Sequence, residues 1–83
     1  MSITSPLKEK RRIVKSVIER LKSRFNLSVS EIEKQDSRSQ AVIGIALVSN
    51  DGPFVGRQLD TVIKFIRRDG RFHVGQIDRE VFS

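Results

Sequence analysis

The sequence predicts one α+β domain in the order helix–strand–strand–helix–strand. Two segments repeat apolar residues at helical spacing, one short stretch alternates apolar and polar residues, and eight consecutive apolar residues follow that stretch. The chain has 83 residues, of which 37% are hydrophobic and 31% are charged. That length suits a single small core and is too short for two domains. We therefore expect residues 1–83 to form one domain.

The first helix is expected over residues 6–25, after an N-terminal stub at 1–6. Ser5 suits the N-cap position and Pro6 the first helical position. Apolar residues then follow at i, i+3, i+4, i+7 and i+11. This stripe, which should face the core, consists of Val14, Val17, Ile18, Leu21 and Phe25. Asn26 is a suitable stop, because asparagine tolerates the left-handed cap conformation.

Two strands are expected next, over residues 27–34 and 41–48, with a polar turn between them. In the first, Leu27 and Val29 alternate with serines until Ile32 breaks the phase, which predicts a bulge near Glu31. The second is apolar on both alternations and rich in β-branched residues, which is typical of a central strand. We expect the two strands to pair as an antiparallel hairpin.

A second helix is expected over 53–69 and a last strand over 71–82. The helix has apolar residues at i, i+4, i+7, i+8 and i+11 and ends at Asp69 and Gly70. In the strand, Phe72 and Val74 alternate before a phase shift. A helix between two strands of one sheet predicts a right-handed parallel crossover. The expected architecture is a small mixed sheet with both helices on one face.

The strand at 41–48 carries apolar residues on the face that would otherwise meet water. These residues are Val42, Gly44, Ala46 and Val48. Sheets of this kind normally leave that face polar. Two interpretations remain open: a second subunit covers this face, which gives a homodimer interface, or small apolar residues are tolerated there.

The composition excludes several classes of protein and site. There is no Cys, so neither a disulfide scaffold nor a thiolate metal site is available. No run of 18 apolar residues and no apolar signal core occurs, so we expect a cytoplasmic protein without a membrane span. His73 is the single histidine, so a pair of histidines is not available. The strand-end acids Glu31, Glu33 and Asp36 have no second group of catalytic or metal-binding residues placed to face them in the predicted fold. We therefore expect no catalytic residue, no metal and no cofactor.

The net charge of +6 lies entirely in the first helix. Residues 1–25 hold eight basic and two acidic residues, and the rest of the chain is balanced. Helical spacing places five cations in one ribbon: Lys8, Arg11, Arg12, Lys15 and Lys22. Lys10, Arg20 and Arg24 are secondary candidates. A cationic ribbon about 20 Å long on a helix suits phosphates, although long basic side chains can equally form a solvated face.

The absence of Trp and Tyr bears on the kind of nucleic acid. Single-stranded bases are commonly bound by stacking on aromatic side chains, and such a platform is missing here. The expected function is a non-enzymatic module that binds structured RNA by shape and phosphates. The alternative is a homodimeric protein-interaction domain that uses the second sheet face and no nucleic acid.

Several segments resemble the YlxP-like family of small bacterial proteins of unknown function. They are Leu7-Lys-Glu-Lys-Arg11, residues 24–31, Gln35-Asp36 and residues 41–51. The resemblance implies a ferredoxin-like (split βαβ) fold and, because the family's genes lie near those for translation initiation and ribosome maturation factors, a role with the ribosome. Family members begin with an apolar strand, where this sequence has residues 1–6. A ferredoxin-like fold without its first strand is therefore expected.

The element order is also similar to that of ribosome-binding factor A, a type II KH-like RNA-binding protein. The similarity lies in a basic first helix, a strand rich in Val and Ser, and an apolar second strand. It too implies RNA or a ribosomal subunit as the partner. The G-x-x-G loop that clamps nucleotides in KH domains is absent from this sequence.

Overall fold

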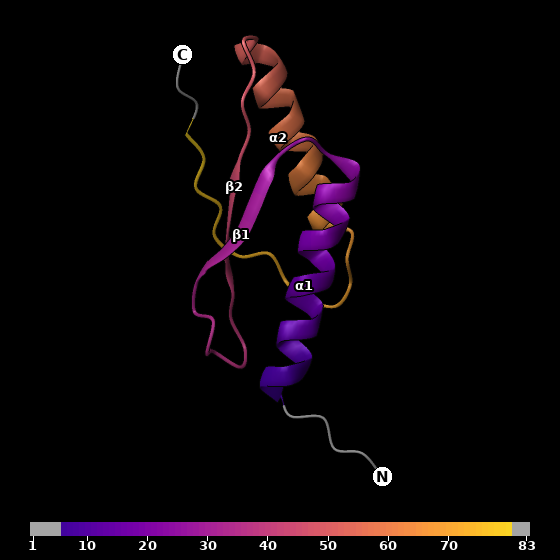
Figure 1. The fold of residues 1–83 in the computed structure, drawn as a ribbon, viewed down its shortest axis with the longest axis vertical. Helices are drawn as coiled ribbons and strands as arrows, with labels where there is room; N and C mark the ends of the chain where they lie inside the picture. Colours follow the sequence, from indigo (N-terminus) through magenta and orange to yellow (C-terminus); the bar gives the residue numbers. More distant parts are fainter. Residues whose placement is uncertain (1–5, 81–83) are drawn as a thin grey trace. The chain divides into compact units, whose positions relative to one another are not determined.

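The computed structural model describes residues 6–80. Their elements follow in the order α1 (Pro6–Arg24), β1 (Ser28–Glu33), β2 (Val42–Ala46) and α2 (Gly52–Arg67) (Figure 1). The chain divides into two compact units, of which the first ends at Ala46 and the second begins at Leu47. The α+β class is confirmed, and these four elements begin and end within two residues of the predicted positions.

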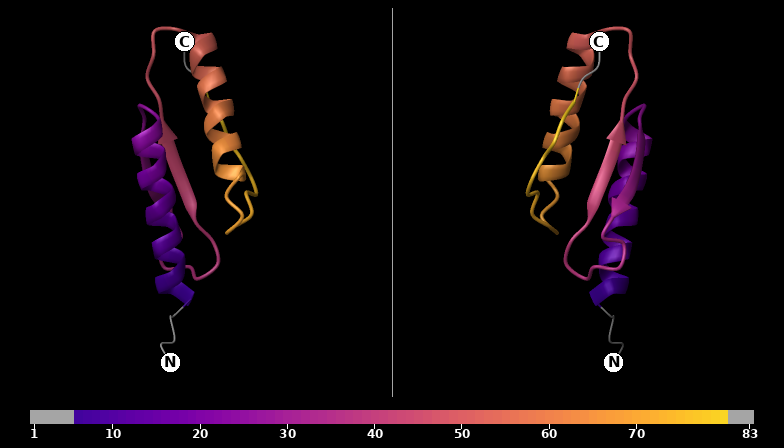
Figure 2. Two further views of the ribbon diagram at one scale, coloured as in Figure 1. Left: turned by 90° about the vertical axis from the view of Figure 1, so that its right-hand side faces the viewer. Right: turned by 90° about the vertical axis from the view of Figure 1, so that its left-hand side faces the viewer.

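The first unit is built by packing α1 against the hairpin. Val14, Val17 and Leu21 of α1 are buried, and Val29 of β1 is buried with them. Figure 2 shows α1 running alongside the two strands. Each such side chain contributes about 1.5–3 kcal/mol through its removal from water. The predicted stripe thus supplies the core of this unit, with Ile18 and Phe25 half-buried at its margin.

The predicted antiparallel hairpin is confirmed. Ser28 is opposite Ala46 and Val29 is opposite Ile45, and the register shifts between Glu31 and Glu33. That shift is the predicted bulge, with Ile32 as the extra residue. Because side chains alternate along a strand, Val29, Glu31, Ile43 and Ile45 share the face toward α1. The opposite face carries Ser28, Ser30, Gly44 and Ala46.

The second unit contains α2, which begins with a side-chain cap. The Asp51 carboxylate accepts a hydrogen bond from the backbone N–H of Phe54 at 3.2 Å. Pro53 follows in the first turn, where a missing N–H costs nothing. These local signals explain why the helix begins one residue before the predicted start.

Replacing Asp51 with alanine removes this cap. We expect the free energy of unfolding to fall by about 1 kcal/mol, because an N-terminal N–H of α2 loses its acceptor. Urea unfolding followed by circular dichroism measures the change. Asp51→Asn is the matched control, since asparagine caps almost as well. An alanine variant as stable as the asparagine variant would contradict this role of the cap.

The strand predicted over 71–82 is wrong for residues 71–80, which form no strand; residues 81 and 82 lie outside the described part. The alternation of Phe72 and Val74 ends at Gly75, and glycine weakens a strand. The segment is instead tied to α2, because Arg79 donates to Asp60 Oδ1 at 2.6 Å and to the Gly56 carbonyl at 3.2 Å. Within residues 6–80 the sheet is two-stranded and antiparallel, so the expected mixed sheet and parallel crossover are wrong there.

Candidate nucleic-acid interface on α1

Five exposed cations lie on the side of α1 that faces away from the core. At 3.6 residues per turn they fall within an arc of about 100°, roughly opposite the buried stripe. They span about 21 Å along the helix axis, at a rise of 1.5 Å per residue. We call this surface the outer cation face; its members are Lys8, Arg11, Arg12, Lys15 and Lys22. The structure thus brings together the five residues of the predicted ribbon.

The acidic partners of the outer cation face are themselves accessible to solvent. Arg12 Nη2 lies 2.6 Å from Glu9 Oε1, and Arg11 Nη2 lies 3.4 Å from Asp36 Oδ1. Exposed ion pairs of this kind contribute about 0–1 kcal/mol. A phosphate can therefore replace either carboxylate at small cost.

Three further charged residues of α1 bear on the charge and the extent of the outer cation face. Glu19 lies within the same arc and is exposed, so it lowers the positive potential between Lys15 and Lys22. The secondary candidates Arg20 and Arg24 are exposed, but helical spacing places them on a different side of α1. They do not extend the outer cation face.

Lys10 points into the protein and not toward solvent. It precedes Val14, Val17 and Leu21 by four, seven and eleven residues, so it lies on the buried stripe. Its side chain is 10% exposed, and Nζ lies 2.6 Å from Glu31 Oε2. The same ammonium donates to the carbonyls of Lys34 at 2.9 Å and Gln35 at 3.4 Å. Its three donors are therefore engaged, which removes this residue from the candidate phosphate contacts.

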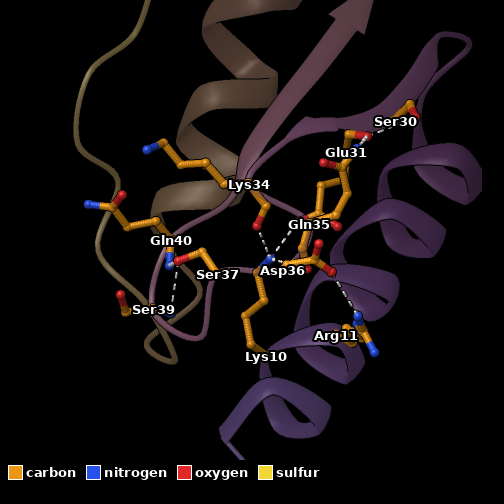
Figure 3. Close-up of polar contacts among 10 residues, drawn as sticks. All are labelled: Lys10, Arg11, Ser30, Glu31, Lys34, Gln35, Asp36, Ser37, Ser39 and Gln40. Carbon is orange, nitrogen blue, oxygen red and sulfur yellow. Dashed lines mark hydrogen bonds and ion pairs between the residues drawn. The ribbon is translucent and has the colours of Figure 1, made fainter.

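The contacts of Lys10 hold the loop between β1 and β2 beside the first turns of α1 (Figure 3). Lys34 has a φ of 62°, in the left-handed region, and its carbonyl also accepts the N–H of Ser37 at 3.0 Å. The Ser37 hydroxyl in turn accepts the N–H groups of Ser39 and Gln40. The loop is thereby shaped by local hydrogen bonds and anchored by one internal cation.

The side chains of the three strand-end acids, Glu31, Glu33 and Asp36, do not converge on one point. Glu31 is held by Lys10, Asp36 lies beside Arg11, and Glu33 is exposed beyond the bulge. Across residues 6–80 no group of three or more histidine and carboxylate side chains is placed to hold a metal ion. In the same part of the chain, no helix has the length and hydropathy to cross a bilayer.

The residues proposed for a second interface fall into two places. Val42, Gly44 and Ala46 share the face of β2 opposite α1, whereas Val48 lies beyond β2 and is 96% exposed. Ile32, which was not among the predicted interface residues, also lies on this face and is 57% exposed. A Cβ added to Gly44 would lie 3.0 Å from Ile32 Cγ2, so the glycine leaves room for the isoleucine. The predicted bulge was the available signal for this placement.

Comparison with known proteins gives two matches. Residues 1–79 match a family model described as "Protein of unknown function (DUF503)". The chain is 40% identical over 60 residues to the uncharacterized protein YlxP of Bacillus subtilis (strain 168), a match that covers 72% of this chain. The matched region spans 65% of the length of that relative. No solved structure is significantly similar to the chain. These matches confirm the resemblance seen in the sequence.

Proposed function

For this chain, which belongs to the DUF503 family of proteins of unknown function, we propose the role of a non-enzymatic module that binds structured RNA. The RNA phosphates contact the outer cation face of α1, and ribosomal RNA is the expected partner class. The family assigns no activity, so the proposal depends on the geometry of the helix.

The observation that carries the proposal is the contrast between two kinds of lysine on one helix. Lys10 is nearly buried, and carboxylate and carbonyl oxygens surround its ammonium. Lys15 and Lys22 are exposed, and no ion pair engages either of them within residues 6–80. The fold therefore uses Lys10 internally, and it leaves Lys15 and Lys22 exposed on the surface where a polyanion could contact them.

The same helix argues against two other anionic partners. A membrane-surface helix needs its apolar side in the lipid, but the apolar stripe of α1 packs on β1. Single-stranded nucleic acid is usually held by aromatic stacking, and the outer cation face contains no aromatic residue. Contacts made only to phosphates favour a partner whose phosphates are fixed in space, as in folded RNA.

The preference for folded RNA is tested by fluorescence anisotropy at a fixed, moderate salt concentration. We expect the protein to bind a hairpin fragment of ribosomal RNA with sub-micromolar affinity. An unstructured strand of the same length should bind more weakly, because it has no ordered phosphate array and finds no stacking platform. Equal or tighter binding of the single strand would contradict the proposal.

A single substitution on the outer cation face should act without regard to RNA sequence. Lys22→Ala is expected to weaken binding to all structured RNAs by a similar factor. It should also reduce the log–log salt slope by about 0.9, because one fewer phosphate is neutralised. The matched control is Arg57→Ala, an exposed cation of α2 that should leave the slope unchanged. A sequence-dependent loss would point to base contacts.

A further inference from the structure

Within residues 6–80, one edge of strand β2 pairs with no other strand. The strand pairs with β1 on one side, and the sheet contains no third strand there. Backbone donors and acceptors along such an edge can pair with another strand. Natural edge strands are usually protected by charges, proline or a bulge. Residues 41–48 contain no charge and no proline, and the bulge lies in β1.

We propose that this edge pairs with β2 of a second copy of the chain. The two strands run antiparallel about a two-fold axis through Gly44, which gives a continuous sheet in the order β1–β2–β2–β1. β2 has five residues, so this centre is the one that pairs all of them. An interface of this kind is self-complementary, as a two-fold dimer requires.

The chemistry of the strand favours a second copy as the occupant. In this register Val42 is opposite Ala46 of the other copy, and Ile43 is opposite Ile45, so each cross-strand pair is apolar. No like charges meet, although each chain carries +6. Strand β1, by contrast, carries the two carboxylates Glu31 and Glu33, whereas β2 carries no charged residue. The neutral strand is thus the part of this unit best suited to contact its own copy.

The position of α1 is compatible with this pairing. The helix packs over β1, and its outer cation face points away from the sheet. Opposite residues of an antiparallel pair lie on one face, so both copies of α1 would lie on the same side of the extended sheet. Ile43 and Ile45, which are half-buried in one chain, gain apolar neighbours across the two-fold axis. The dimer therefore presents two outer cation faces.

Sedimentation equilibrium of the full chain over a range of protein concentrations tests the pairing. We expect a monomer–dimer equilibrium that salt does not weaken, because the interface has no ion pair and salt screens the repulsion between the two chains. In Val42→Lys/Ala46→Lys, lysine would stand opposite lysine twice. The dissociation constant should rise by about tenfold or more.

A charge-paired variant separates the interface from any effect on folding. Val42→Lys/Ala46→Glu puts lysine opposite glutamate, and it should dimerise more tightly than the double-lysine variant. Val48→Lys adds a charge at an exposed residue beyond β2 and should dimerise like the unmodified chain. Circular dichroism confirms the fold of each. A chain that stays monomeric at all concentrations, or equal dissociation constants for the two double variants, would overturn the proposal.

Discussion

Replacing Arg11, Arg12 and Lys15 with glutamate is expected to abolish RNA binding and leave the fold intact. All three side chains are exposed on the outer cation face, away from the stripe that packs on β1. The substitution removes three of five proposed phosphate contacts and adds repulsion. We expect the affinity for structured RNA to fall at least ~100-fold.

The matched control for this variant carries the same change in net charge at another place. Arg57, Lys64 and Arg67 are exposed cations of α2, and their replacement by glutamate also lowers the net charge of the chain by six. Anisotropy titrations of the two triple variants at one salt concentration show whether the loss of affinity depends on where the charges are changed or only on the net charge. Equal losses of affinity would show that only net charge matters. If the α1 variant binds RNA as tightly as the unmodified chain, the outer cation face is not the RNA-binding site.

Lys10→Ala is expected to lower stability more than any other single truncation of a basic residue on α1. It leaves Glu31, whose side chain is 15% exposed, without its cation, and the carbonyls of Lys34 and Gln35 each lose a donor. Removing one partner of a largely buried ion pair costs about 3 kcal/mol. Lys15→Ala, at an exposed position, should change stability by no more than about 0.5 kcal/mol.

Urea unfolding followed by circular dichroism measures both alanine variants. A second variant, Lys10→Met/Glu31→Leu, removes both charges and fills similar volume, so it should recover most of the lost stability. If Lys10→Ala and Lys15→Ala unfold at the same urea concentration, the internal role of Lys10 is contradicted. Failure of the double variant to recover stability would instead assign the effect to the carbonyl contacts.

The predictions that succeeded depend on local patterns. The stripe of Val14, Val17 and Leu21 defines which side of α1 is buried, and this also determines which cations face solvent. The phase break at Ile32 predicted the bulge, because a strand with one extra residue must shift its register. Such features need only neighbouring residues, so one sequence was sufficient.

The predictions that failed depend on distant partners. The periodicity that defines the stripe also includes Lys10, but its charge made it a secondary candidate for phosphate contact. Its true partners, Glu31 and the loop carbonyls, are more than twenty residues away. The strand expected over 71–82 failed over its described part for a related reason. A strand forms only against an edge, and Arg79 joins this segment to α2.

The most direct test of the account is the salt dependence of RNA binding. The purified protein is titrated into a labelled hairpin of ribosomal RNA, and anisotropy gives the affinity at each salt concentration. If the outer cation face neutralises five phosphates, we expect a log–log slope of affinity against salt concentration of about −4.5. Weak binding with a slope near zero would contradict it, because the cations of α1 would then be a solvated surface.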